Sequence, residues 1–177
     1  MQHQRATRIR RLGPVVVGAL LVLGSCESAG TLAGGGARSD YLVARQALET
    51  GNYALAVRRY EGLIGRTAPG TARRLELEYA HGLLRADRHD DAIRVASALV
   101  GAADGSIRGS ALAVRGTARH EAARLRIDRG DRGPETRALM NAAREDLVAF
   151  LAGHGALDTA GSMRARVELI AADSQGL

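Results

Sequence analysis

The chain of 177 residues contains one cysteine, Cys26, and its position limits the chemistry that the thiol can perform. It ends a short apolar run and follows two small residues in the segment Leu23-Gly24-Ser25-Cys26. A single cysteine has no second cysteine in the same chain with which to form a disulfide. At the end of an apolar run, it is better placed to carry a lipid than to act as a nucleophile.

Other reactive side chains do not form a recognisable catalytic or metal-binding pattern. The histidines after Cys26 are not in an HExxH motif or a Cys/His cluster that could hold zinc; they are His81, His89, His120 and His154. Glu76 and Glu78 are two residues apart, so on a helix they point in different directions. No serine lies in a GxSxG motif. We therefore predict that the chain is not an enzyme and that it holds no metal and no other cofactor.

The elements before Cys26 resemble those that direct a protein out of the cytoplasm. Residues 1–11 contain four arginines and no acid, and Leu12–Leu23 is almost wholly apolar. A bilayer-spanning helix needs roughly 20 apolar residues, so this run is too short to span comfortably. A basic start, a short apolar core and a small-residue exit are typical of a bacterial secretory signal, which we assign to residues 1–25.

The segment Leu23-Gly24-Ser25-Cys26 resembles the lipobox of bacterial lipoproteins, with an aliphatic residue and two small ones before the cysteine. The resemblance implies cleavage before Cys26, a diacylglycerol thioether on its sulfur and an acyl chain such as palmitate on the new amino group. Two or three chains would hold the protein firmly on a membrane. An aspartate directly after the cysteine would favour retention in the inner membrane. Glu27 occupies that position here, so we expect the protein to be anchored on the periplasmic face of the outer membrane. The alternative is an ordinary cleavable signal with an unmodified cysteine.

The charge of the chain is concentrated in the predicted signal. There are 25 arginines, no lysine and a formal net charge of +6, but loss of residues 1–25 would lower it to +2. What remains has no basic stripe with stacking aromatic residues. We therefore predict no nucleic-acid partner.

Residues 26–39 follow as the predicted lipidated cysteine and a flexible linker rich in Gly, Ala and Ser, with an r.m.s. span of about 20 Å. The predicted domain, residues 40–177, is rich in Ala and Leu and has few aromatic residues. This composition favours closely packed helices and an all-α fold.

The domain begins with two helical patterns that are interrupted by Gly51-Asn52, where glycine allows the left-handed backbone that ends a helix. Pro69-Gly70 is expected to close this unit, and Thr71 to cap the next helix. Small Ala44 and Ala56 would let the two helices approach. The predicted packing residues around them are Leu48, Tyr53, Tyr60 and Leu63.

The same pattern returns along the chain. Five positions of the first hairpin, Ala44, Gly51, Tyr53, Ala56 and Tyr60, recur 36 residues later as Ala80, Asp87, His89, Ala92 and Ala96. A weaker third unit has Ala123 and Gly130 at the same spacing, and its next helix starts near Pro134. The predicted packing residues of that helix are Leu139, Ala143, Leu147, Phe150 and Leu151. A last helix over residues 157–174 would cap the array through Leu157, Ala160, Met163, Val167 and Ile170.

Gly51, Tyr53, Ala56 and Tyr60, with the recurring alanines, resemble the tetratricopeptide repeat, a pair of antiparallel helices of about 34 residues. The early Trp and Leu-Gly of that motif are absent, and Asp87 replaces its turn glycine. The resemblance implies a short tetratricopeptide-like α-solenoid of antiparallel helix pairs with a C-terminal capping helix. The alternative is an ordinary helical bundle, which would make the chain a non-repeat lipoprotein.

In tetratricopeptide proteins the first helix of each pair lines a concave groove. The resemblance implies that a protein or peptide partner is bound in a groove lined by Arg38, Tyr41, Arg45, Leu48, Arg74, Leu77, His81, Leu84, Arg85 and Arg119. Arginine binds carboxylates through two parallel hydrogen bonds, so an acidic or C-terminal segment is the expected occupant.

The function implied is that of a protein-interaction scaffold in an envelope assembly, such as secretion, pilus or outer-membrane biogenesis machinery. One alternative is a binder of small anionic envelope ligands that uses the same groove. In another, the arginines only solvate helix faces and pair with nearby acids, as Arg74 would with Glu78.

Overall fold

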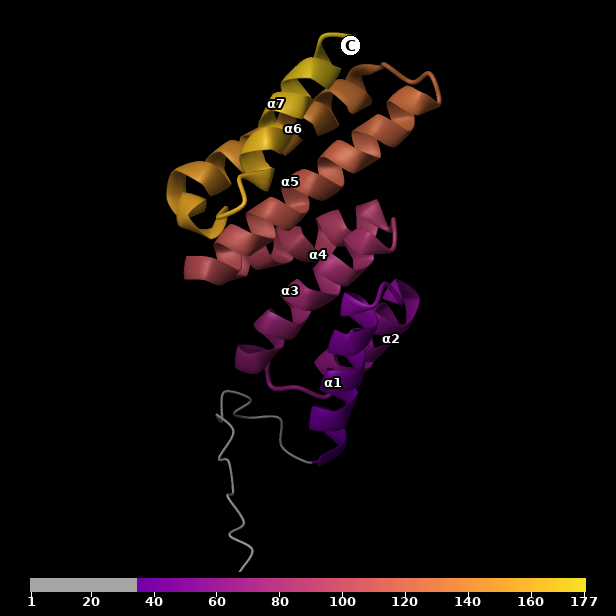
Figure 1. Ribbon diagram of the computed structural model, residues 1–177, viewed down its shortest axis with the longest axis vertical. Coiled ribbons are helices and arrows are strands. Elements are labelled where there is room, and N and C mark those ends of the chain that lie inside the picture. The colour runs from indigo at the N-terminus through magenta and orange to yellow at the C-terminus, as the bar shows by residue number, and fades with distance from the viewer. Residues whose placement is uncertain (1–34) are drawn as a thin grey trace, which may run out of the picture. The chain divides into compact units, whose positions relative to one another are not determined.

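The computed structural model describes residues 35–177, which form an all-α domain (Figure 1). This confirms the all-α part of the predicted fold class, and the described residues contain no strand. Cys26 and the predicted signal lie outside this range. The helices are α1 (Gly35–Glu49), α2 (Tyr53–Ile64), α3 (Pro69–Arg85), α4 (His89–Ala102), α5 (Gly105–Asp128), α6 (Pro134–His154) and α7 (Ser162–Ser174), with a 3-10 turn at Gly155–Leu157.

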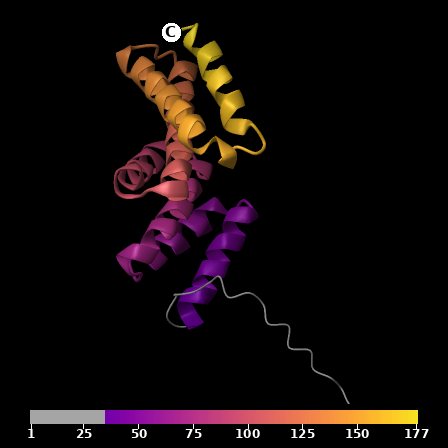
Figure 2. The same ribbon diagram turned by 90° about the vertical axis from the view of Figure 1, so that its left-hand side faces the viewer.

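Successive helices pack against each other as antiparallel pairs from α1–α2 to α6–α7 (Figure 2). Two further contacts skip a helix, because α3 also touches α5 and α5 also touches α7. The apolar core consists of three clusters that follow one another along the chain. The first is centred on α1–α4, the second on α4–α6 and the third on α5–α7. Within residues 35–177, no helix is long and apolar enough to cross a membrane.

Three of the helix pairs turn in the same way. The second residue after the first helix has a left-handed backbone, with φ of 82° at Gly51, 57° at Asp87 and 83° at Gly130. In each turn the next residue donates its N–H to the carbonyl five positions earlier, at 2.8–2.9 Å. This bond is the signature of the Schellman motif, which satisfies the free carbonyls at a helix end. The prediction that Asp87 takes the place of the turn glycine is confirmed.

Alanine lies where the helices of each pair cross. The predicted crossing residues Ala44 and Ala56 and the alanines that repeat them are fully buried, as is the predicted packing residue Ala143. The repeating alanines are Ala80, Ala92 and Ala123. A methyl group is the largest side chain that lets two helix backbones approach so closely, and larger residues then fill the space around it. The predicted packing residues Tyr60, Leu63, Leu99, Leu147 and Phe150 are buried as expected.

The crossing of α5 and α6 uses glycine as well as alanine. A Cβ on Gly116 would lie 2.8 Å from Leu147 and 3.0 Å from Asp146. A Cβ on Gly109 would lie 2.5 Å from His154. These two glycines and Ala123 are spaced seven residues apart, so they share one face of α5. That spacing of small residues was present in the sequence but was not among the predicted features.

Two predicted boundaries at the start of helices differ in the structure. Pro69-Gly70 begins α3 instead of closing the first unit, so Thr71 lies inside the first turn. Proline suits that position because its fixed φ matches a helix and its missing N–H would have no partner there. At the other boundary, α1 begins at Gly35, so residues 35–39 are helical where a linker was predicted. Ala37 packs against the first core cluster, which gives this early turn a tertiary contact.

The last helix begins five residues later than predicted, at Ser162. Asp158 accepts hydrogen bonds from the backbone N–H groups of Met163 and Arg164, at 3.0 and 3.1 Å, and these bonds fix the start of α7. Leu157 therefore lies in the 3-10 turn, and Ala160 is exposed in the loop. The predicted apolar stripe is limited to Met163, Val167 and Ile170.

Candidate partner-binding groove

A continuous groove follows α3, α5 and α7, helices that are not consecutive in the chain. It consists of two hollows of about 740 and 480 Å³. Both hollows are lined by four of the same residues, which makes them neighbours: His81, Ala113, Val114 and Met163. The groove is therefore built by the first helices of the second and third pairs together with the last helix.

Six of the ten residues that were predicted for a groove line these hollows. They come from α1 and α3 and are Arg45, Arg74, Leu77, His81, Leu84 and Arg85. Their shared position follows from helical spacing, because residues three, four and seven apart on α3 fall on one face.

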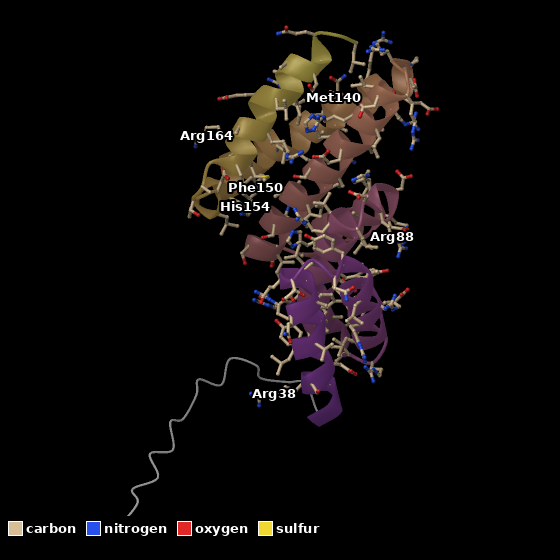
Figure 3. The ribbon with its side chains drawn as sticks, turned by 45° about the vertical axis from the view of Figure 1, so that its right-hand side comes forward. Arg38, Arg88, Met140, Phe150, His154 and Arg164 are labelled. Atoms are coloured by element: carbon tan, nitrogen blue, oxygen red, sulfur yellow. The ribbon has the colours of Figure 1, made fainter. Side chains whose placement is uncertain are left out.

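Three of the remaining four predicted residues lie elsewhere on α1. Tyr41 packs edge-on against Tyr60, with ring centroids 6.5 Å apart, and Leu48 packs against the first core cluster. Arg38 is exposed in the first turn of the helix (Figure 3). None of the three lines either hollow.

The predicted position of Arg119 in the groove is wrong. Its guanidinium lies 2.7 Å from Asp146, on the side of α5 that faces α6. When the third unit is aligned on its turn, Gly130 matches Asp87 with an offset of 43, and Arg119 then matches Glu76, which also lies outside the groove lining. The same offset pairs Thr117 with Arg74 and Glu121 with Glu78, and all four line the hollows. Alignment on the turn was thus the signal that could have found them.

The carboxylate of Glu78 organises the end of the groove nearest α1. It accepts hydrogen bonds from the hydroxyls of Tyr60 at 2.6 Å and Tyr41 at 3.3 Å, and its side chain is only 11% exposed. Arg45 and Arg74 lie 3.6 and 3.7 Å away, so their charges are partly balanced within the chain. Burial and the hydrogen bond to this carboxylate raise the pKa of Tyr60. The predicted alternative in which Arg74 pairs with Glu78 is confirmed for that pair.

Arg85 is held in the groove wall by an aromatic residue. Its guanidinium lies 5.1 Å from the ring centroid of Tyr53 and donates to the Tyr53 hydroxyl at 2.6 Å. Such a contact fixes the position of the guanidinium and leaves its positive charge unbalanced. Among residues 35–177, Arg85 forms no ion pair with an acid. His81 is solvent-exposed, but the groove wall displaces part of the water around it; this desolvation, and then the charge of neighbouring Arg85, lower its pKa.

Most acids in the groove wall are occupied by partners within the chain. Glu121 pairs with Arg166 at 2.6 Å, and Asp158 binds the start of α7 through backbone N–H groups. Asp87, at the α3–α4 turn, is the exposed exception. The groove therefore offers apolar surface beside Arg85, which has no acid partner among residues 35–177. Its other arginines pair with acids: Arg45 with Glu49 and Glu78, Arg74 with Glu78, and Arg166 with Glu121.

His89 packs inside the protein at the turn of the second helix pair. It is buried at the position where the first pair has Tyr53, and Asp87 lies 3.8 Å from its ring. In residues 35–177, no three His, Cys, Asp or Glu side chains come together as a candidate metal site.

Comparison with protein families, with curated proteins and with solved structures finds no match to this chain. The function of the chain is therefore inferred from the geometry of its groove and from the sequence before the helical domain.

Proposed function

We propose that the chain is a lipoprotein of the bacterial envelope whose tetratricopeptide-like domain acts as a protein-interaction scaffold. The observation that carries this proposal is the repetition of one turn in three helix pairs, at Gly51, Asp87 and Gly130. Buried alanines at each crossing and a groove along α3, α5 and α7 support the same interpretation. A helical bundle without repeats gives no reason for the same turn to recur at related positions.

The partner that best suits the groove is a protein segment with carboxylates and apolar side chains. Arg45, Arg74 and Arg85 would bind the carboxylates, and Leu77 and Val114 would contact the apolar groups. Arginine forks discriminate carboxylates by geometry as well as by charge. On a membrane-anchored protein, even a weak groove is effective, because anchoring raises the local concentration of a partner on the same membrane.

The membrane anchor is tested by Cys26→Ser. This variant should incorporate no labelled fatty acid and should accumulate as a precursor of higher mass, because serine cannot form the thioether. Ser25→Ala is the matched control, since it keeps a small residue beside the intact cysteine and should be labelled normally. If Cys26→Ser matures to the normal length, the segment is an ordinary signal and the anchor does not exist.

The groove is tested by the double variant Arg45→Ala with Arg74→Ala. We expect at least about a tenfold loss of captured partner, because each lost charged hydrogen bond costs about 1.5–3 kcal/mol. The measurement is quantitative mass spectrometry of proteins crosslinked to the chain in intact envelopes.

The matched control for charge is Arg58→Ala with Arg144→Ala, which removes two exposed arginines from α2 and α6. This control should capture the partner as the unchanged protein does. Equal capture by both double variants would rule out the groove as the binding site. Thermal stabilisation of the purified domain by small dicarboxylates, with no protein captured, would favour the small-ligand alternative.

A further inference from the structure

The last helix is attached to α5 through a fully buried histidine. His120 Nε2 lies 2.9 Å from Asp173 Oδ2, and His120 Nδ1 lies 3.2 Å from Arg166 Nη1. Arginine can only donate hydrogen bonds, so Nδ1 must be the acceptor. The proton therefore sits on Nε2 and is donated to Asp173. This arrangement requires a neutral imidazole.

Within residues 35–177, the charged groups around His120 come from α7 and from α5. From α7 they are Arg166 and Asp173, and from α5 itself they are Glu121, paired with Arg166 at 2.6 Å, and Arg124, 3.7 Å from Asp173. Two α6 carboxylates pair with α5, Asp146 with Arg115 and Arg119 and Glu135 with Arg126, and neither pairs with His120.

The apolar attachment of α7 is small. Ile170 is its one buried side chain, while Met163 and Val167 are partly buried and Leu169 is exposed. Arg164 lies on the outer side of the helix (Figure 3). The cluster that contains Ile170 consists mainly of α6 residues, so the polar contacts of His120, Arg166 and Asp173 are a main link between α7 and α5.

We propose that protonation of His120 releases α7 from α5 and thereby controls the groove. A proton on Nδ1 would replace the acceptor that Arg166 uses with an N–H that points at a guanidinium. The two donors repel, and the buried imidazolium adds a second positive charge beside Arg166. Protonation of His120 would therefore shift α7 from a docked state to a released state.

The expected direction of the pH effect follows from the surroundings of His120. Burial is the main cause that lowers its pKa; the hydrogen bond to Asp173 opposes this effect and the charge of Arg166 adds to it. The docked state consequently binds a proton less readily than the released state. Docking is complete above the ordinary histidine pKa of about 6.5 and weakens as the pH falls below it.

Release would remove part of the groove wall. Met163 and Arg166 line the groove, and the sulfur of Met163 accepts a hydrogen bond from the Thr117 hydroxyl at 3.8 Å. The consequence for a partner rests on the proposed function, so capture should decrease at acidic pH. The release itself is independent of any partner and is measured on the free protein.

The experiment is amide hydrogen exchange of the mature chain at about pH 7.5 and about pH 5, followed for α7 and, as an internal reference, for α2. Above about pH 5 the carboxylates remain ionised, and the hydrogen bond and charge of Arg166 outweigh burial to lower the pKa of Glu121. We expect protection of α7 to fall severalfold relative to α2, because the released imidazole, with its ordinary pKa of about 6.5, binds a proton at about pH 5 more readily than the docked one. His120→Gln keeps a neutral donor and should abolish the change, although His81, His89 and His154 remain.

Two further variants separate titration from a purely structural role. Arg166→Gln removes a positive charge that lowers the pKa of docked His120, so the fall in α7 protection between about pH 7.5 and about pH 5 should become smaller. Asp173→Asn removes the carboxylate that opposes this lowering of the pKa, so the same fall in α7 protection should become larger. Unchanged relative protection of α7 in the unaltered protein, or a change of this fall in the same direction in both variants, would overturn the proposal.

Discussion

Replacing Asp146 with alanine is expected to destabilise the domain by about 3 kcal/mol, because it breaks a buried ion pair and leaves its partners without a counter-charge. The Asp146 side chain is 5% exposed and holds two arginines of α5. Arg115 binds it through two hydrogen bonds of 2.9 and 2.5 Å, and Arg119 binds it at 2.7 Å. Both guanidiniums would then remain largely buried at the α5–α6 crossing.

Asp91→Ala is the matched control for this prediction. Asp91 also bridges two arginines, Arg88 at 2.6 Å and Arg94 at 2.8 Å, but this cluster lies at the surface. Exposed ion pairs contribute only about 0–1 kcal/mol, and salt weakens them further. Urea denaturation of both variants measures the difference in the free energy of unfolding. If the two variants lose equal stability, burial does not determine the strength of the Asp146 cluster.

Gly116→Ala should lower stability by about 2 kcal/mol, although alanine is the better helix former, because the added methyl overpacks the α5–α6 crossing. The new Cβ would lie 2.8 Å from the Leu147 side chain. Leu147 is fully buried against Met140, Ala143 and Ile170, so it has no free space into which to move. The helices must separate to accept the methyl.

Gly62→Ala provides the comparison within a helix that lacks this constraint. A Cβ on Gly62 in α2 would contact nothing within 4 Å. This substitution should stabilise the domain by about 0.5–1 kcal/mol, because alanine loses less backbone entropy than glycine. The two variants should therefore change the thermal midpoint in opposite directions. A higher midpoint for Gly116→Ala would show that the α5–α6 crossing is looser than the structure indicates.

The features that could be predicted from the sequence are those that local patterns determine. A left-handed residue at Gly51 or Asp87 and an alanine three to seven positions away both follow from the geometry of one helix pair. The same pattern predicts which faces of α1 to α4 are buried. Six groove residues on α1 and α3 were predicted because the resemblance to tetratricopeptide repeats implies that the first helix of each pair lines a groove.

The features that were missed depend on contacts between distant residues. Asp158 fixes the start of α7 because its carboxylate accepts a hydrogen bond from the backbone N–H of Met163. No periodic pattern in the sequence encodes this contact. The sequence around Arg119 gives no sign that its guanidinium binds a carboxylate. Its partner, Asp146, lies 27 positions away in the chain. His120 likewise finds Asp173 and Arg166 only when α7 folds back.

The most direct test of the proposed scaffold is site-specific photocrosslinking in intact cells. A benzophenone amino acid at His81, an exposed α3 residue that lines both hollows, should form a discrete adduct with a partner protein. The same amino acid at Arg94, exposed on α4, should form none. The His81 adduct should also disappear when Arg45 and Arg74 are both alanine. An adduct of equal yield at Arg94, or one at His81 that survives loss of both arginines, would contradict binding in the groove.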